Sequence, residues 1–229
     1  MNVNITRIKA VNQVLKELPQ EFVFVGGATV ELYVSKPEVA PEVRPTDDVD
    51  VVVELASYSG YSELDEKLRK IGFVNDIASG VMCRYKFQGL IVDVMPTHPE
   101  AVGFSNKWYP EGFKTAQEIV LDDQSSIKIF NLPYFIASKW EAFKGRGNND
   151  YRTSKDFEDL VYIFENVDDF KEQITVAPEH LLKYFKEEFK PLIEDPDFEE
   201  GLFCHLTGGY GGVDANYIFE KLKDAFEIR

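Results

Sequence analysis

The feature that most constrains this chain is a run of β-branched residues that contains two carboxylates. Residues 44–53 read RPTDDVDVVV, and the valines predict a β-strand. Because side chains alternate between the two faces of a strand, Asp48 and Asp50 point to the same face. Two like charges on one side of an apolar strand repel each other and lose hydration unless a cation neutralises both. The strand therefore predicts a divalent cation at Asp48 and Asp50.

The type of ligand narrows the choice of metal ion. Carboxylate oxygens favour Mg²⁺ or Mn²⁺ over zinc, and Mg²⁺ is usually held by one or two carboxylates together with substrate phosphates. The strand thus indicates metal-assisted phosphate chemistry. The alternative is structural: Asp48 caps the strand in solvent and Asp50 faces water from an edge strand.

A glycine pair upstream adds a second element of the same chemistry. Residues 21–25, EFVFV, predict a buried strand that ends at Gly26 and Gly27, and the apolar spacing of residues 28–34 predicts a following helix. A strand that turns through two glycines into a helix leaves backbone N–H groups open to an anion. Phosphate could bind at Gly26 and Gly27, and the alternative is that the glycine pair forms only a turn.

A third acid lies on a further strand. Residues 90–95, LIVDVM, place Asp93 alone in an apolar segment bounded by Gly89 and Pro96. A single carboxylate in such a strand could be a structural exception. A third one, after Asp48 and Asp50, indicates a shared site.

A lysine falls on the apolar face of a predicted helix that begins near Pro133. The stripe consists of Leu132, Phe135, Ile136, Trp140 and Phe143, and Lys139 lies on it. An inward-facing lysine needs an anion, and metal-bound phosphates would supply one. The alternative is that the side chain extends past its neighbours to solvent.

The next predicted helix begins near Asp156. A carboxylate there is favoured by the helix dipole, and Asp156 could also orient Lys139 or a nearby arginine. The basic residues between the two helices are either solvated or flank the site. They are Lys144, Arg146, Arg152 and Lys155.

The net charge of the chain limits which kinds of substrate it can bind. The chain has 229 residues, 44% of them hydrophobic, and a formal net charge of −15, so it can bury a core but is poorly suited to non-specific nucleic-acid binding. Any RNA contact must be local, through residues 139–155 and Lys107. Trp108 and Tyr109 could stack a base or pack in the core. The acidic charge equally fits an acceptor that is not a nucleic acid.

The remaining composition predicts a cytoplasmic protein. The first residues lack a basic segment followed by an apolar one, and no apolar run approaches membrane-spanning length, so no membrane association is expected. Cys83 and Cys204 lack C-x-x-C spacing, which fits a reducing compartment. The three histidines are scattered and predict no metal site.

Along the chain the pattern changes from mixed α/β to helical. We expect an α+β fold: a small mixed β-sheet core at residues 1–130, flanked by helices, and a helical C-terminal part at residues 131–229 that contributes Lys139. The glycine cluster at residues 208–212 predicts a hinge or turn. Predicted helices cover residues 5–18, 63–71, 179–193 and 217–226, and predicted strands lie near Phe73, at 82–87, around Asp93 and at 126–130.

The order of these motifs resembles that of the DNA polymerase β-type nucleotidyltransferase superfamily. The order is Gly-Gly, then Asp-x-Asp, then a later lone Asp. The finer similarity is to the bacterial AbiEii/AbiGii-type nucleotidyltransferases, which include toxins of toxin–antitoxin systems. It rests on Arg44 and Thr46 before the acidic pair, and on residues 133–147, 150–151 and 154–160. The resemblance covers roughly residues 20–165.

The resemblance implies transfer of a nucleoside monophosphate from an NTP to an acceptor, with pyrophosphate leaving. Asp48 and Asp50 would hold two Mg²⁺ (or Mn²⁺) ions, and Asp93 would complete the second metal site or take the acceptor's proton. Arg44 and Thr46 would brace the Asp48 strand. The nucleotide-binding residues it implies are Gly26, Gly27, Thr29, Lys139 and Asp156.

Three interpretations stay open at this point. The first is a toxin-like transferase that modifies tRNA or a protein and has an antitoxin partner. The second is a small-molecule nucleotidyltransferase of the antibiotic-modifying type, which the acidic charge permits. The third is a catalytically silent module that binds a nucleotide or a partner, although such a module has no physical need for three buried carboxylates.

Overall fold

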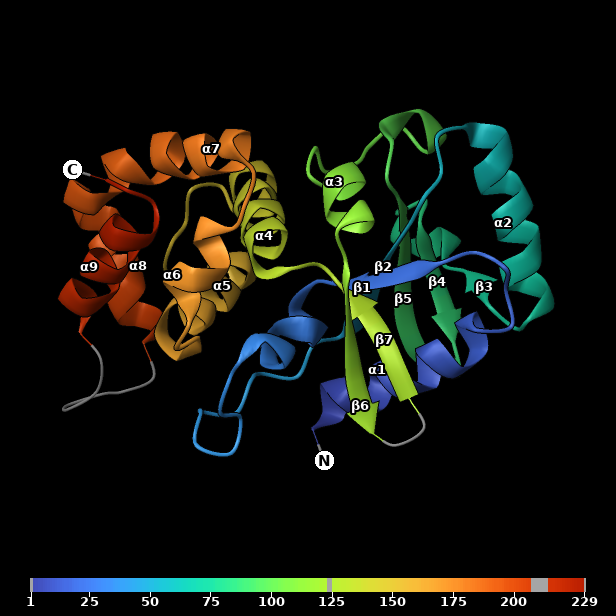
Figure 1. Ribbon diagram of the computed structural model, residues 1–229. Coiled ribbons are helices and arrows are strands. Elements are labelled where there is room, and N and C mark those ends of the chain that lie inside the picture. The colour runs from blue at the N-terminus through green and yellow to red at the C-terminus, as the bar shows by residue number, and fades with distance from the viewer. Residues whose placement is uncertain (1, 123–124, 207–213, 229) are drawn as a thin grey trace. The chain divides into compact units, whose positions relative to one another are not determined.

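The chain forms two compact units, which we describe separately (Figure 1). The structure, a computed structural model, describes residues 2–122, 125–206 and 214–228. The sheet unit comprises Met1–Thr29 and Arg44–Phe135, and the helical unit comprises Val30–Val43 and Ile136–Arg229. The glycine cluster at residues 208–212 lies outside the described residues.

The sheet unit is built on a seven-stranded mixed sheet of order β3-β4-β5-β2-β1-β7-β6. Strand β2 runs antiparallel to β1 and parallel to β5, so it occupies the centre. The strands are β1 (Phe22–Val25), β2 (Asp48–Val53), β3 (Val74–Asn75), β4 (Arg84–Phe87), β5 (Leu90–Pro96), β6 (Gln117–Asp122) and β7 (Ser125–Ile129). The predicted α+β class with a mixed sheet is confirmed.

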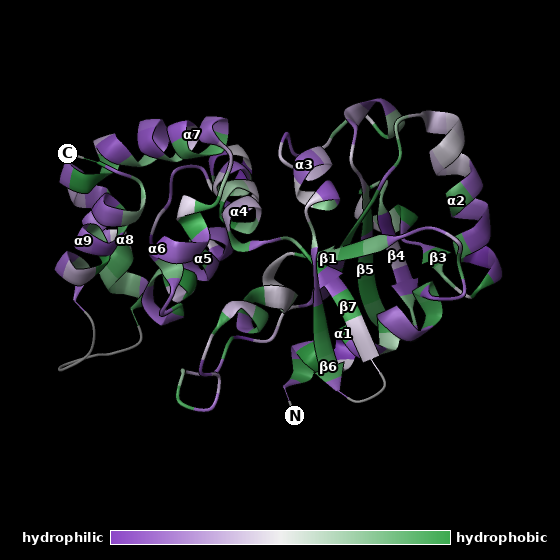
Figure 2. Cartoon of the chain, viewed as in Figure 1, coloured by the Kyte–Doolittle hydropathy of each residue, from purple (hydrophilic) through white to green (hydrophobic). Residues whose placement is uncertain are grey.

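Central strands are apolar because both of their faces are covered. All four residues of β1 are buried, as are Val51, Val52 and Val53 of β2. Figure 2 shows β5 mostly in hydrophobic colours, whereas α2 (Tyr58–Lys70) displays hydrophilic residues on its visible side. Continuous apolar strands are typical of buried parallel pairs, so the carboxylates in β2 and β5 are exceptions that need a reason.

Helix α1 (Val3–Leu15) anchors the segment that leads into β2. The side chain of Asn4 donates to the carbonyl oxygen of Arg44 (3.0 Å) and accepts from the backbone N–H of Thr46 (2.9 Å). The Thr46 hydroxyl donates to the carbonyl oxygen of Asp48 at 2.9 Å. The predicted bracing of the Asp48 strand is therefore confirmed for Thr46, whereas these bonds involve only the backbone carbonyl of Arg44.

Helix α2 lies on the sheet face opposite the carboxylates. The Tyr85 hydroxyl, on β4, donates to Asp65 of α2 at 2.9 Å, and the Tyr61 hydroxyl of α2 donates to the carbonyl oxygen of Val94. Since Tyr85 follows Arg84 in the strand, the two side chains point to opposite faces. The Arg84 side chain therefore lies on the same sheet face as the three carboxylates, and α2 lies on the other face.

The helical unit is held together by aromatic side chains. Ring centroids lie 5.4 Å apart for Phe143 and Phe157, 5.5 Å for Phe157 and Phe198, and 4.9 Å for Phe189 and Phe226. Edge-on and tilted contacts of this kind add to the hydrophobic burial. Its elements are α4 (Leu132–Arg146, which begins in the sheet unit), α5 (Lys155–Asn166), α6 (Phe170–Thr175), α7 (Glu179–Phe189), η4 (Lys190–Glu194), α8 (Pro196–His205) and α9 (Ala215–Ala225).

The structure adds short elements that the sequence pattern does not predict. These are β6, α3 (Tyr109–Lys114), α6, α8, η2 (Ile77–Ser79) and η3 (Pro99–Ala101). The helix expected after Gly27 is a 3₁₀ helix, η1 (Gly27–Tyr33), rather than an α-helix. The acidic stretch near Asp195 starts α8, because the Asp195 side chain accepts from the backbone N–H of Asp197.

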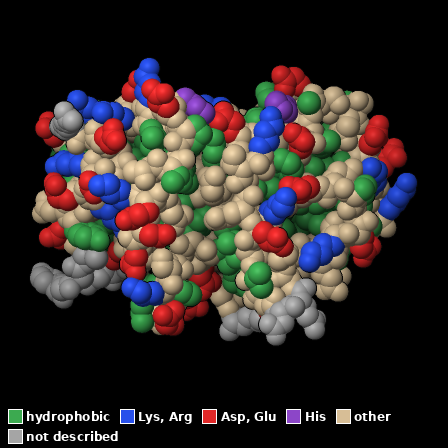
Figure 3. All heavy atoms as spheres, viewed as in Figure 1, with side chains coloured by type: hydrophobic (Ala, Val, Ile, Leu, Met, Phe, Trp, Pro, Cys, Tyr) green, Lys and Arg blue, Asp and Glu red, His purple; other side chains and the backbone are tan. Residues whose placement is uncertain are grey.

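On the face shown in Figure 3, charge is not concentrated by sign. Acidic and basic side chains are interspersed over the visible face in Figure 3, although 40 Asp and Glu outnumber 25 Lys and Arg in the chain. Among the described residues, no helix combines the length and apolar character needed to cross a membrane.

Candidate active site

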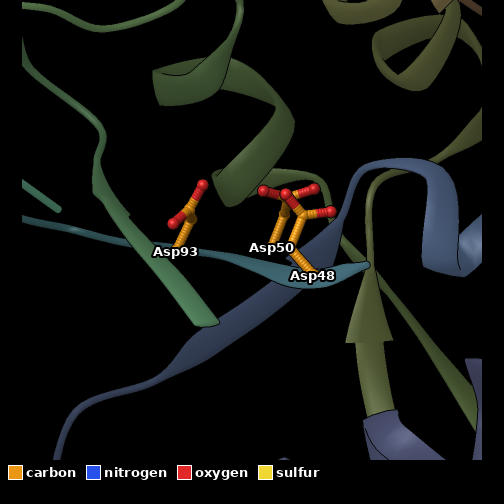
Figure 4. A group of neighbouring side chains, drawn as sticks. All are labelled: Asp48, Asp50 and Asp93. Carbon is orange, nitrogen blue, oxygen red and sulfur yellow. The ribbon is translucent and has the colours of Figure 1, made fainter. Parts of the chain in front are cut away.

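Two parallel strands bring the three predicted carboxylates together. Asp50 of β2 pairs in register with Asp93 of β5, and Asp48 precedes Asp50 by two residues on the same face. One oxygen from each carboxylate can be chosen so that all three lie within 4.8 Å of one another. Figure 4 shows the three side chains rising from the same side of the sheet. Asp93 is 7% exposed, and Asp48 and Asp50 are half-buried.

Gly26 lies directly against this cluster. Its backbone has φ +74°, and a Cβ atom at this position would lie 1.9 Å from Oδ2 of Asp50. Thr29 closes the turn, because its N–H and its hydroxyl both donate to the carbonyl oxygen of Gly26, at 3.2 and 3.0 Å. Both the left-handed backbone and the close approach of the carboxylate require glycine here.

We expect Gly26→Ala to lower the free energy of unfolding by roughly 2–4 kcal/mol, because it adds a steric clash to the cost of a positive φ. Gly89→Ala is the matched control: its φ is +83°, but nothing lies within 4 Å of the added Cβ. That variant should lose only about 1 kcal/mol. Urea unfolding of both variants measures the difference, and equal losses would show that Asp50 does not crowd Gly26.

Arg84 is a site residue that the sequence interpretation missed. Its Nε donates to Oδ1 of Asp93 (2.8 Å), and its Nη2 donates to Oδ2 of Asp93 (2.7 Å) and to Oδ2 of Asp48 (3.3 Å). The hydrogen bonds that Arg84 donates to Asp93 raise the pKa of the guanidinium, which therefore stays charged. Arg84 joins two of the three carboxylates.

The pairing of Arg84 with Asp93 has a signal in the sequence. Strands β4 and β5 form a hairpin whose two-residue turn is Gln88 and Gly89, both at positive φ. Counting back from Phe87 opposite Leu90 places Arg84 opposite Asp93. A prediction of the turn type would have found this residue.

The cluster fits a divalent cation of the oxygen-seeking type. It offers three carboxylates on one face of the sheet, and oxygen-only ligands suit Mg²⁺ or Mn²⁺. Arg84 neutralises part of the charge. Three negative charges face one positive charge, so negative charge remains for a metal.

In the helical unit, Lys139 faces inward as predicted, and its side chain is 8% exposed. Its ammonium donates to Asp156 Oδ1 (3.0 Å) and to Asp159 Oδ2 (2.6 Å). Arg146 also donates to Asp156, from Nε at 2.7 Å. Asp156 was predicted to orient Lys139 or a nearby arginine, and it pairs with both; it also lies in the first turn of α5, whose N-cap is Ser154.

Charge pairing shifts the pKa values of Asp156 and Lys139. Burial alone would raise the pKa of Asp156, but the attraction of Lys139 and the hydrogen bond from Arg146 lower it to about 2. Burial would likewise lower the pKa of Lys139, but Asp159 and Asp156 raise it. Asp159 was missed by the sequence interpretation, although it follows Asp156 by three residues and so lies on the same side of α5.

The basic residues near Lys139 are engaged in ion pairs. Lys144 pairs with Glu141 and Glu188, both at 2.8 Å, and Arg152 pairs with Glu200. The predicted aromatic platform is also largely internal, because Trp108 is 7% exposed. Core packing of Trp108 is confirmed, and the basic run offers a nucleic acid less free charge than its sequence indicates.

Comparison with known proteins identifies the family. A family model described as nucleotidyl transferase AbiEii toxin, type IV TA system, matches residues 10–206. The chain belongs to the AbiEii nucleotidyltransferase toxin family. The match includes the acidic cluster, the Gly26 turn and the Lys139 group, and it places the chain in the nucleotidyltransferase class.

Solved structures give more distant likenesses to this AbiEii-family chain. An antigenic nucleotidyltransferase-like protein from Paracoccidioides brasiliensis is 15% identical, with 95% of this chain and 96% of that chain covered and a TM-score of 0.47. The antibiotic-resistance factor ANT(2'')-Ia is 14% identical, with 82% and 94% covered and a TM-score of 0.48. No curated protein matches the chain. We base the family assignment on the family match.

Proposed function

We propose that this chain is a toxin-type nucleotidyltransferase that moves a nucleoside monophosphate from an NTP to an acceptor, with pyrophosphate leaving. The observation that carries the proposal is the convergence of Asp48, Asp50 and Asp93 beside the Gly26 turn. Family membership supports the same reaction class. A silent binding module would have no need for three carboxylates at one point of an apolar sheet.

The acidic cluster is the proposed metal site. Asp48, Asp50 and Asp93 would hold Mg²⁺ or Mn²⁺, which, when bound, neutralises phosphate charge and lowers the pKa of the acceptor hydroxyl. Asp93 is the most buried of the three carboxylates and the one held by two hydrogen bonds from Arg84. We assign it to the second metal position or to acceptance of the acceptor's proton.

In the sheet unit, the phosphates of the nucleotide are proposed to bind at the glycine turn. Gly26 and Gly27 would present backbone N–H groups to the phosphates, with Thr29 fixing the turn through its bonds to the Gly26 carbonyl. In the helical unit, taken by itself, Lys139 and Asp156 are proposed as nucleotide-binding residues, and their ion pairing holds the lysine ammonium in one orientation. A fixed cation of this kind can offset charge that develops on a phosphoryl group.

A protein or tRNA is the proposed acceptor, and an antitoxin is the proposed partner, as the toxin–antitoxin description of the family suggests. The net charge of −15 and the ion pairs of Lys144 and Arg152 favour a protein over an acceptor bound mainly through its phosphates. The same observation keeps a small-molecule acceptor as the second candidate.

The test is incubation of the full chain with each of four α-labelled NTPs and with total tRNA, a protein extract or a set of small-molecule antibiotics. We expect Mg²⁺- or Mn²⁺-dependent label that ribonuclease, protease or chromatography assigns to one acceptor class. Chelation of the metal should abolish labelling. Folded protein that transfers no label to any acceptor, with either metal, would contradict the proposal.

A further inference from the structure

We propose that Arg84 is a positioning residue that occupies the acidic cluster as its resident cation and must be displaced when a metal binds on the Asp93 side. The inference rests on the proposed metal site. It adds a feature of this chain, namely that metal binding at Asp93 is an exchange of one cation for another.

The contacts of one nitrogen atom carry the argument. Nη2 of Arg84 lies 2.7 Å from Oδ2 of Asp93 and 3.3 Å from Oδ2 of Asp48. It therefore links one oxygen of Asp93 to one oxygen of Asp48. Mg²⁺ binds oxygen at about 2.0–2.1 Å, so a metal and this nitrogen cannot bridge the same pair of oxygens together.

The hydrogen bond from Nε shows which carboxylate Arg84 binds more strongly. Nε donates to the other oxygen of Asp93, so the guanidinium engages Asp93 with two parallel hydrogen bonds and Asp48 with one longer bond. Bidentate pairs of this type are the strong ones, and the Asp93 side chain is only 10% exposed. Arg84 thus acts mainly on the Asp93 side of the cluster.

The guanidinium also has space to move. Arg84 lines a cavity of about 480 Å³ at the sheet edge, together with Asp65, Asp76, Ile77 and Met82. The side chain of Arg84 is 25% exposed, so the movement does not require opening of the core.

The consequence is an inequality between the two proposed metal positions. A cation held by Asp48 and Asp50 leaves the Arg84–Asp93 pair intact, whereas a cation that uses Asp93 must break it. Metal at the second position should therefore bind more weakly than the carboxylates alone would allow. Arg84 would keep Asp93 oriented and neutralised until that metal arrives.

The test is a titration of chelator-treated protein with Mn²⁺ alone. Calorimetry and the electron paramagnetic resonance signal of free Mn²⁺ measure the binding. We expect Arg84→Gln to raise the weaker Mn²⁺ affinity on the order of tenfold and to lower the melting temperature in EDTA, since Asp93 and Asp48 then lack their cation. Arg84→Lys keeps the charge without the fork and should give a smaller rise. If Arg84→Gln does not fold, this second variant decides the matter.

The matched control is Arg69→Gln, which changes another arginine of the same cavity that pairs with Asp65. Its Mn²⁺ affinity should equal that of the wild type. Suppose that both Arg84 variants bind Mn²⁺ no more tightly than the wild type, and that the wild type shows metal-dependent transfer. This result would contradict the role of Arg84 and leave the proposed metal site standing. If the wild type binds no Mn²⁺, the proposed metal site fails, and the inference fails with it.

Discussion

Asp50→Asn is expected to lower nucleotide transfer at least about a thousandfold while the protein stays folded. Asp50 pairs in register with Asp93 and lies against Gly26, so it is at the centre of the cluster. A neutral amide of nearly the same shape removes a metal ligand, and loss of about 4 kcal/mol of metal stabilisation corresponds to this factor. The labelled-NTP assay measures it.

Stability separates this expectation from a folding defect. In metal-free buffer, Asp50→Asn should unfold at the same or a higher urea concentration than the wild type, because it removes repulsion among three carboxylates. The matched control is Asp47→Asn, the same chemical change at the exposed position just before the cluster. Its transfer rate should stay within about twofold of the wild type. Retained transfer or failed folding of Asp50→Asn would each refute the site assignment.

Lys139→Met is expected to lower the free energy of unfolding by about 3–5 kcal/mol at pH 7. The change leaves Asp156 and Asp159, whose side chains are 7% and 2% exposed, without the ammonium that both accept from. Arg146 still pairs with Asp156, so Asp159 bears most of the loss. Urea unfolding measures the effect, and Lys139→Met combined with Asp159→Asn should recover part of it.

The control for this expectation is Lys144→Met on the same helix. The Lys144 side chain is 32% exposed and pairs with Glu141 and Glu188, and ion pairs at such positions contribute about 1 kcal/mol or less. If the two lysine variants lose equal stability, the buried ion-pair group does not stabilise the helical unit as described. Transfer by Lys139→Met should be compared at a temperature where the variant is folded.

The pH dependence of this group follows from the pKa of Asp156. The folded value, about 2, lies below the ordinary 3.8, so the carboxylate contributes stability above pH 3.8. That contribution is lost as the pH falls from 3.8 to about 2. The stability difference between wild type and Lys139→Met should therefore shrink in the same interval.

Local pattern was enough to find the carboxylates and their shared face. Alternation along residues 44–53 places Asp48 and Asp50 on one side, and two glycines after an apolar strand predict the turn at Gly26. These features depend only on near neighbours in the chain. The helix that carries Lys139 and the inward direction of this lysine are predictable for the same reason.

Partners across the chain were beyond this kind of prediction. The sequence showed that Lys139 needs an anion, but two carboxylates of α5 supply it in the fold. Packing also decides that Val30–Val43 belongs to the helical unit, where the Tyr162 hydroxyl donates to the carbonyl oxygen of Pro41 at 2.7 Å. Such contacts join residues far apart in sequence, so periodicity carries no record of them.

The sequence by itself determined the chemistry that is available: three carboxylates on apolar strands, a glycine turn and an inward lysine. Tertiary structure alone decided how these charges are shared. Strand register places Asp93 beside Asp50 and brings Arg84 between Asp93 and Asp48. The physical reason is that side-chain direction follows from local geometry, whereas the neighbour across a strand depends on pairing, turn type and the packing of the whole sheet.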